Sequence, residues 1–130
     1  MIKRFSQWLT EELDSQDFAE LERFADDHFS ELGLDVVFTK HFKDRVNDAR
    51  NGAPVSYDEL EDLLLKAFNK AGHTLSKLPV ESEAVLKQLA TWLNVPVKVM
   101  DDPDHNEKDL VLKTIMRKRH FETPNPEIKI

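Results

Sequence analysis

The chain has 130 residues, no cysteine and a net charge of −7 at pH 7. That length suits one domain, and the lack of cysteine excludes a disulfide framework and a thiolate metal site. Only three glycines occur, and no segment approaches the roughly 18 apolar residues of a membrane span, so we expect a soluble domain without a glycine-rich phosphate loop, a cofactor or a membrane partner.

The negative charge lies at the N-terminal end. Residues 1–35 hold three bases and ten acids, whereas residues 36–130 hold 15 bases and 15 acids. We therefore divide the chain into an acidic helical segment, 1–35, and an α+β domain, 36–130. A neutral body can bind RNA, whereas a uniformly acidic surface would repel its phosphates.

Two amphipathic helices are predicted in the acidic segment. Apolar residues recur on one helical face over residues 2–13 and again over 18–32, and Gly33 is a suitable stop. The β-prone run 34–38 follows, and after it the pattern favours a helix over residues 40–50.

The next helix has the best-defined start in the chain. After the break at 51–54, Ser56 and Glu59 form a capping box, because the hydroxyl and the carboxylate can each bond a backbone amide left open at a helix start. The apolar positions that follow predict a helix that ends near Gly72.

The C-terminal half is predicted to consist mainly of strands. Residues 81–93 fit either a helix face or a buried strand, and periodicity leaves both open. Residues 95–100 and 110–116 alternate as strands and form a hairpin across the polar turn 101–106, and the tail at 127–130 could add an edge strand. We expect an α+β fold with N-terminal helices followed by a small antiparallel sheet of about four strands packed on the two preceding helices.

The sequence pattern does not favour a metal site. Asp102, Asp104 and Asn106 have the spacing that begins an EF-hand loop, but Glu107 stands where glycine is needed and Lys113 stands where glutamate is needed. The five histidines form no close ligand pair, which argues against zinc.

The segment around His41 and Arg45 carries the clearest chemical pattern. The two residues are four positions apart, so they share one face of a helix. A histidine and an arginine that project together can transfer a proton and stabilise a phosphate, as RNA cleavage requires. In the alternative interpretation, Arg45 forms an ion pair with Asp44 or Asp48 and has no catalytic role.

A concentrated basic patch near the C-terminus is the candidate nucleic-acid-binding surface. Its residues are Lys113, Arg117, Lys118, Arg119 and His120. Strand alternation predicts that Lys113, Ile115 and Arg117 share one side, and that Thr114 lies on the other side unless a bulge intervenes. In the alternative interpretation, the basic strand is a solvated edge.

Two stretches carry a family resemblance: the run from His41 to Gly52, and the hairpin end from Leu112 to Lys118. Over roughly residues 36–123 the chain is similar to a family of small uncharacterised proteins of tailed phages. More distantly, it resembles the phage-borne members of the barnase, colicin and RelE-like (BECR) ribonuclease superfamily. Those domains place a His-x-x-x-Arg helix ahead of an antiparallel sheet that carries a Thr or Ser on a late strand.

The resemblance implies roles for three residues. It implies His41 as general acid or base, Arg45 as phosphate clamp and Thr114 as substrate contact. The chain departs from the pattern because it offers no clear second catalytic partner, for which Lys113, Arg117 and His120 are the candidates.

The first residues carry a second resemblance. Residues 1–12 look like the helical leader of phage internal head proteins, and Leu9-Thr10-Glu11 resembles the Leu-x-Glu site of prohead proteases. The alternative is a first amphipathic helix that docks on the core.

Three functional hypotheses follow from the sequence. The first is a phage-encoded effector that acts on RNA in the host cytoplasm, as a metal-independent endoribonuclease or by binding RNA or a host protein. The second is a non-catalytic internal head protein, packaged in the virion with capsid components as partners. The third is an inhibitor whose acidic helices mimic nucleic acid.

Overall fold

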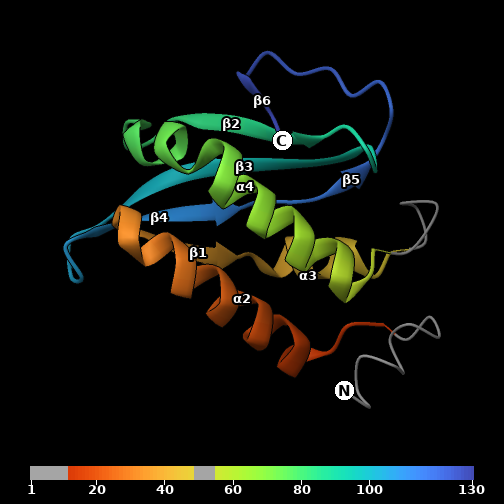
Figure 1. Ribbon diagram of the computed structural model, residues 1–130, viewed down its shortest axis with the longest axis horizontal. Helices are drawn as coiled ribbons and strands as arrows, with labels where there is room; N and C mark the ends of the chain where they lie inside the picture. Colours follow the sequence, from red (N-terminus) through yellow and green to blue (C-terminus); the bar gives the residue numbers. More distant parts are fainter. Residues whose placement is uncertain (1–11, 49–54) are drawn as a thin grey trace.

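The computed structural model describes residues 12–48 and 55–130, which form one layer of helices on one face of a mixed sheet (Figure 1). The elements are, in chain order, α2 (Ser15–Phe29), the 3-10 helix η1 (Ser30–Leu32), β1 (Leu34–Phe38), α3 (Lys40–Val46), α4 (Tyr57–Lys77), β2 (Glu83–Gln88), β3 (Leu93–Asp102), β4 (Glu107–Leu112), β5 (Met116–Arg117) and β6 (Glu127–Lys129).

The sheet has six strands, in the order β1-β4-β3-β2-β6, with β5 paired to the start of β3. The expected α+β class is confirmed. Strands β3 and β4 form the predicted antiparallel hairpin, and β2 pairs antiparallel with β3. The sheet is larger than the predicted four strands and is mixed, because β1 pairs parallel to β4 and β6 pairs parallel to β2. In each parallel pair the two strands lie far apart along the chain, so local sequence patterns do not predict the pairing.

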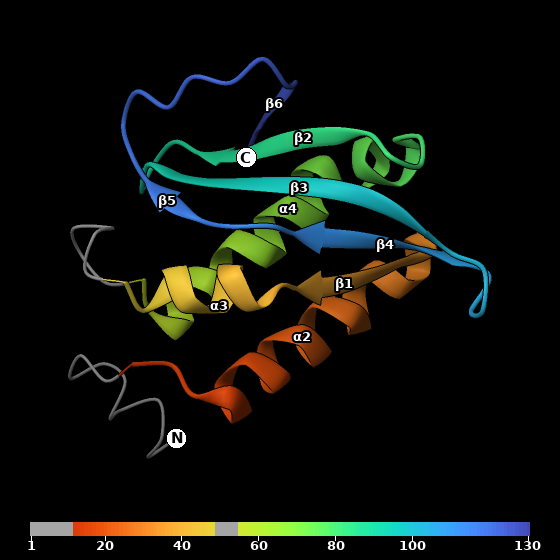
Figure 2. The ribbon, with the colours of Figure 1, turned by 180° about the vertical axis from the view of Figure 1, so that it is seen from behind.

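The helices cover only one face of this sheet. Figure 1 shows α2 and α4 crossing in front of the strands, and Figure 2 shows that the described helices leave the opposite face uncovered. Helix α3 continues the line of β1 beyond the end of that strand (Figure 2). The face without helices is therefore open to polar side chains and to partners.

Helix α2 begins earlier than the predicted span of 18–32 and also ends earlier, because residues 30–32 form η1. Asp14 and Asp17 form a capping box at its start, and each side chain accepts a backbone N–H at 2.8 Å. Its buried face joins the same core as α4 and the strands. Among the described residues, none of the helices combines the length and the apolar character needed to cross a membrane. The helix expected over residues 2–13 lies outside the described residues, except for its end.

Helix α4 confirms the predicted capping box. The Glu59 N–H donates to Ser56 Oγ at 3.1 Å, and the Ser56 N–H donates to Glu59 Oε1 at 3.2 Å. The helix continues through Gly72 to Lys77. Gly72 is a packing position instead of a stop, because a Cβ atom there would lie 2.9 Å from Leu32 Cδ1.

The ambiguous segment 81–93 forms strand β2 and a turn. Ala84, Val85 and Leu86 are all buried in β2. A strand that is buried on both faces lacks the alternation of apolar and polar residues that marks a half-buried strand. For this reason the sequence pattern does not distinguish a helix from a strand here.

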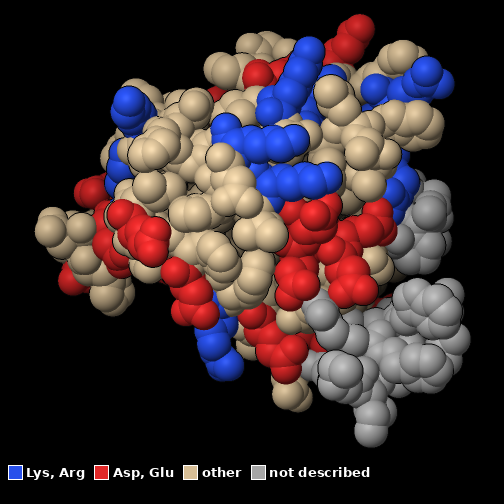
Figure 3. All heavy atoms as spheres, in the orientation of Figure 1, with Lys and Arg blue, Asp and Glu red and all other residues tan. Residues whose placement is uncertain are grey.

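Charge is divided between two regions of the surface. In the view of Figure 3, basic side chains gather mainly in the upper half, on the side of β2 and β6, whereas acidic ones gather mainly in the lower half, toward α2. On this face the acidic side chains therefore lie toward α2 and the basic ones toward β2 and β6.

Gly33 provides a test of this architecture. Its φ of 72° is left-handed, it ends η1, and its carbonyl accepts the Lys108 N–H at 3.1 Å. Nothing lies within 4 Å of an added Cβ, so backbone conformation alone decides the effect. We expect Gly33→Ala to lower the free energy of unfolding by about 1 kcal/mol, measured by urea denaturation, and Gly33→Asn to lower it less. Equal losses for both variants would contradict this explanation.

Candidate functional site

Thr39 joins the start of α3 to the end of β4. Its hydroxyl accepts the Phe42 N–H at 2.9 Å and donates to the Lys113 carbonyl at 2.9 Å. Its own N–H donates to the Leu112 carbonyl at 3.3 Å. These bonds extend the parallel β1–β4 register by one residue, and they hold the first turn of α3 beside the residue that precedes Thr114.

Helix α3 presents its residues as the predicted pattern requires. Phe42 and Val46 are fully buried, and the Phe42 ring stacks on Phe38 with ring centroids 5.1 Å apart. His41 is exposed and Arg45 is half-buried. Asp44, one of the partners considered for Arg45, forms an exposed ion pair with Lys40 at 3.0 Å. His41 is thus available to a ligand at the helix start.

Helix α3 also ends earlier than predicted. Its last residue is Val46, and the Asn47 side chain then bonds both backbone groups of Leu13 at 2.9 Å. Residues 49 and 50 of the predicted helix lie outside the described residues.

Two residues of the predicted basic patch belong to ion pairs. Arg117 donates to both carboxylate oxygens of Glu59 at 2.9 and 3.0 Å and to the Thr91 carbonyl at 3.1 Å. Lys113 bonds Glu83 at 2.6 Å, and this hydrogen bond, together with the Lys113 charge, holds the pKa of Glu83 below its usual value. Lys113 and Arg117 therefore hold parts of the fold together.

The predicted strand alternation holds for Ile115 and Arg117 but not for Lys113, because the pairing with β3 shifts by one residue between β4 and β5. Residues 113–115 lie between β4 and β5 and belong to neither strand. Ile115 is buried in the core and Arg117 reaches α4 on the helix side, whereas Lys113 reaches Glu83 on the open face. The chain shifts register by one residue in this gap, which separates the charges of Lys113 and Arg117.

Lys118, Arg119 and His120 follow β5 and are exposed. Of the other predicted site residues, His41 and Lys113 are also exposed. Thr114, which follows Lys113 in the chain, is half-buried. The structure thus leaves a helix start and a short basic segment as the accessible parts of the predicted site.

A second cluster, which the sequence patterns did not reveal, lies at the opposite end of β1 and β4. Asp35, Asp102 and Asp109 come from three strands, and one oxygen of each lies within 4.8 Å of the others. Among the described residues, this carboxylate group has the geometry to hold a metal ion, and its oxygens suit Mg²⁺, Mn²⁺ or Ca²⁺. Aspartate inside an apolar strand is the sequence signal, but the pairing of the strands is needed to join the three.

The surroundings of Asp109, and of Asp26 on α2, favour the protonated forms of these two carboxyl groups. Burial raises the pKa of Asp109 to about 6, and the neighbouring Asp102 and Asp35 add to the rise. Burial also raises the pKa of Asp26 to about 7, with a further contribution from Asp35, although the Val36 N–H bonds its carboxylate at 2.9 Å. His105 has a raised pKa because it bonds Asp102 at 3.0 Å.

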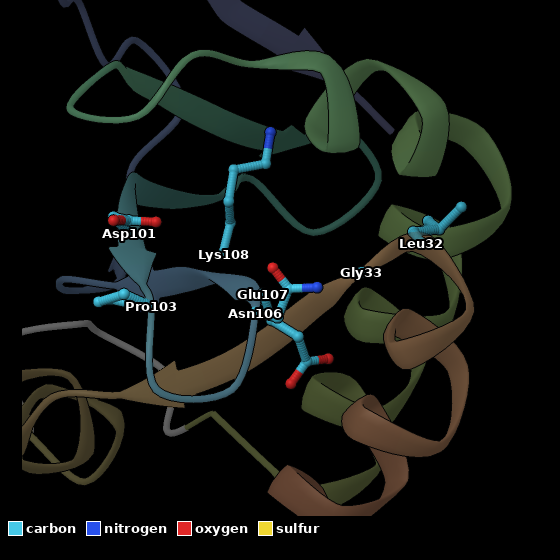
Figure 4. A pocket seen from close by; sticks show the side chains of 7 residues that line it. All are labelled: Leu32, Gly33, Asp101, Pro103, Asn106, Glu107 and Lys108. Atoms are coloured by element: carbon cyan, nitrogen blue, oxygen red, sulfur yellow. The ribbon is translucent and has the colours of Figure 1, made fainter.

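A hollow of about 500 Å³ lies between η1 and the β3–β4 turn (Figure 4). Its lining residues are Leu32, Gly33, Asp101, Pro103, Asn106, Glu107 and Lys108. The Lys108 ammonium donates to the carbonyls of Ser76 and Leu78 at 2.8 and 3.0 Å, so it caps the C-terminal end of α4. The hollow lies at the start of β1, whereas α3 follows the end of that strand, so it does not contain the predicted catalytic residues.

Comparisons of this chain with family models, with curated proteins and with solved structures found no match.

Arg117 provides a test of the scaffold role. Its side chain is 16% exposed and that of Glu59 is 27% exposed. We expect Arg117→Leu to lower the free energy of unfolding by roughly 2 kcal/mol, because the Glu59 carboxylate and the Thr91 carbonyl lose their donor. Lys118→Leu, at the exposed neighbouring position, should change it by less than about 0.5 kcal/mol. Equal effects in urea denaturation would contradict the scaffold role.

The carboxyl cluster predicts a dependence of stability on pH. The folded chain keeps the Asp109 and Asp26 protons up to about pH 6 and 7, whereas unfolded carboxyls release theirs near pH 4. The folded state therefore binds more protons in this window, and stability falls as pH rises through it.

Asp109→Asn should remove part of this dependence. We expect a gain of about 1 kcal/mol in unfolding free energy at pH 8, a value reduced for solvent screening, and a smaller change at pH 5. Asp104→Asn, exposed in the β3–β4 turn, is the matched control. A gain of the same size at both pH values would show that ionisation is not the cause.

Proposed function

We propose that this chain acts on RNA, and that the start of α3 and the segment after β4 form its site. The observation that carries the proposal is the set of Thr39 bonds to the carbonyls of Leu112 and Lys113. They bring the helix of His41 and Arg45 beside Thr114, although 74 positions separate Thr39 from Lys113. The three residues named by the ribonuclease resemblance thus belong to neighbouring segments.

The proposed chemistry is metal-independent cleavage of the RNA backbone. The exposed His41 imidazole would take the proton from the 2′-hydroxyl as its oxygen attacks the phosphorus. The bond from phosphorus to the 5′-oxygen then breaks, the 5′-oxygen takes a proton from water, and a 2′,3′-cyclic phosphate remains. The Arg45 guanidinium would stabilise the charge that develops on the phosphate, and the Thr114 hydroxyl would contact the substrate. Lys118, Arg119 and His120 would supply contacts to phosphates that do not depend on base sequence.

His41 is the residue to test first. We expect His41→Ala to reduce cleavage of a labelled single-stranded RNA by 100-fold or more, on the order of the contribution of one general acid–base group. Arg45→Ala should reduce it as well, because the developing negative charge loses its partner. Cleavage is measured by gel electrophoresis of the labelled RNA in the presence of EDTA, which removes divalent metal ions.

His73→Ala is the matched control, because His73 is an exposed histidine on α4. It should cleave at the rate of the unchanged protein. Absence of cleavage by the unchanged protein, or equal rates for His41→Ala and His73→Ala, would refute the catalytic proposal.

An alternative proposal is a non-catalytic internal head protein of a phage particle. The acidic side of the molecule toward α2 favours it, because that surface could dock on a basic partner in the capsid (Figure 3). The leader-like residues 1–11 lie outside the described residues. Mass spectrometry of purified particles tests this alternative, and absence of the chain from them would refute it.

A further inference from the structure

The turn between β2 and β3 exposes two large apolar side chains. Trp92 is 49% exposed and Leu89 is 55% exposed. Trp92 lies at the end of the sheet where β5 pairs with β3, next to the exposed residues 118–120. About half of the large Trp92 side chain is therefore in contact with solvent beside basic residues.

A polar network holds this turn in place. Asn94 is 1% exposed, and its side-chain amide donates to the carbonyls of Trp92, Met116 and Lys118 at 3.1, 3.3 and 2.8 Å. The Lys118 N–H also donates to the Trp92 carbonyl, at 2.9 Å. The turn and the segment after β5 are therefore fixed to each other.

The other side of the turn is fixed to α4. The Thr91 hydroxyl donates to the Gln88 side chain at 3.0 Å, and Gln88 donates to Asp62 at 3.1 Å. Arg117 holds the Thr91 carbonyl and Glu59 together. The Trp92 ring therefore projects from a rigid support, which reduces the entropy lost when a ligand binds.

The backbone of Trp92 is in an unfavourable conformation for this residue. Its φ is 58°, in the left-handed region that glycine and asparagine adopt most easily. A bulky aromatic residue at such a position is a true outlier, and outliers of this kind gather at functional sites. Folding would favour another residue here, so the ring itself is the feature to explain.

The charge beside the ring fits a polyanion. The Arg119 guanidinium lies over the Trp92 ring, 5.2 Å from its centroid. Lys118 and His120 flank Arg119 and are exposed, and the stretch from Arg117 to His120 contains no acidic residue. An aromatic face with adjoining cations is the arrangement that binds single-stranded nucleic acid, since a base stacks on the ring and phosphates meet the cations.

We propose that Trp92 and Arg119 form a stacking platform for an unpaired base of single-stranded RNA; this inference rests on the proposed function and names its substrate class. The platform connects to the proposed site through one short segment. Thr114 and Lys118 are four residues apart, which is about 13 Å in an extended chain. An RNA strand lying along this segment would reach both Trp92 and α3. A paired base offers no free face to the ring, so single strands are preferred over duplexes.

The test compares binding of a short fluorescein-labelled single-stranded RNA with binding of its duplex, by fluorescence anisotropy. We expect Trp92→Asn to weaken single-strand binding about tenfold, the effect of one lost stacked base. Asparagine suits the left-handed backbone, so the variant should be at least as stable as the unchanged protein in urea denaturation. Trp92→Phe should retain most of the affinity.

Arg119→Ala tests the charge. It should weaken binding and lower the slope of log affinity against log salt by about 0.7, the contribution of one phosphate contact to a single strand. Leu65→Ala and Lys70→Ala, both at exposed positions on α4, are matched controls and should bind normally. Trp92 fluorescence should be quenched by RNA in a Trp8→Phe background, where it is the remaining tryptophan.

Four results would overturn the platform. Three concern binding: Trp92→Asn binds RNA as well as the unchanged protein does, the unchanged protein prefers the duplex, or it binds no RNA. The fourth is that the unchanged protein forms a dimer on analytical ultracentrifugation and Trp92→Asn does not, which would make the patch a protein interface. Failure of the proposed function looks different. In that case RNA binds through Trp92, but the unchanged protein does not cleave it, or His41→Ala cleaves it at the same rate as the unchanged protein.

Discussion

The parallel pairing of β1 with β4 is the constraint on which both candidate sites depend. At one end it continues through Thr39 and brings α3 beside the segment that contains Thr114. At the other end it sets Asp35 opposite Asp109, and Asp102 completes the carboxyl cluster. A shift of this register by one residue would turn the aspartates toward the helices and the apolar residues toward solvent. Burial of the apolar face therefore fixes the chemistry at both ends.

The gap between β4 and β5 decides how the basic residues are used. Because residues 113–115 leave the sheet, Lys113 pairs with Glu83 on the open face and Arg117 pairs with Glu59 on the helix side. Each ion pair ties this segment to another element. The exposed cations that follow β5 remain accessible to solvent, so a patch that is continuous in the sequence is divided between ion-paired residues and an accessible segment.

Several buried or half-buried polar side chains hold the turn before β3 in place at the end of the sheet. Asn94, Gln88 and Arg117 satisfy backbone and side-chain groups of the turn before β3. Buried polar groups are costly unless they are bonded, and a bonded network fixes a single geometry. Here that geometry holds Trp92 outward in a backbone conformation that a tryptophan seldom adopts. The network therefore fixes the position of the exposed ring.

The sequence by itself determined the α+β class, the Ser56–Glu59 capping box, the β3–β4 hairpin and the buried face of α3, because these depend on local periodicity and local hydrogen bonds. It also named His41 and the basic residues as candidates. Only the tertiary structure decided which charges are neutralised, which aspartates meet, and that Trp92 stands beside Arg119. Those outcomes depend on contacts between segments far apart in the chain, and residue spacing carries no record of them.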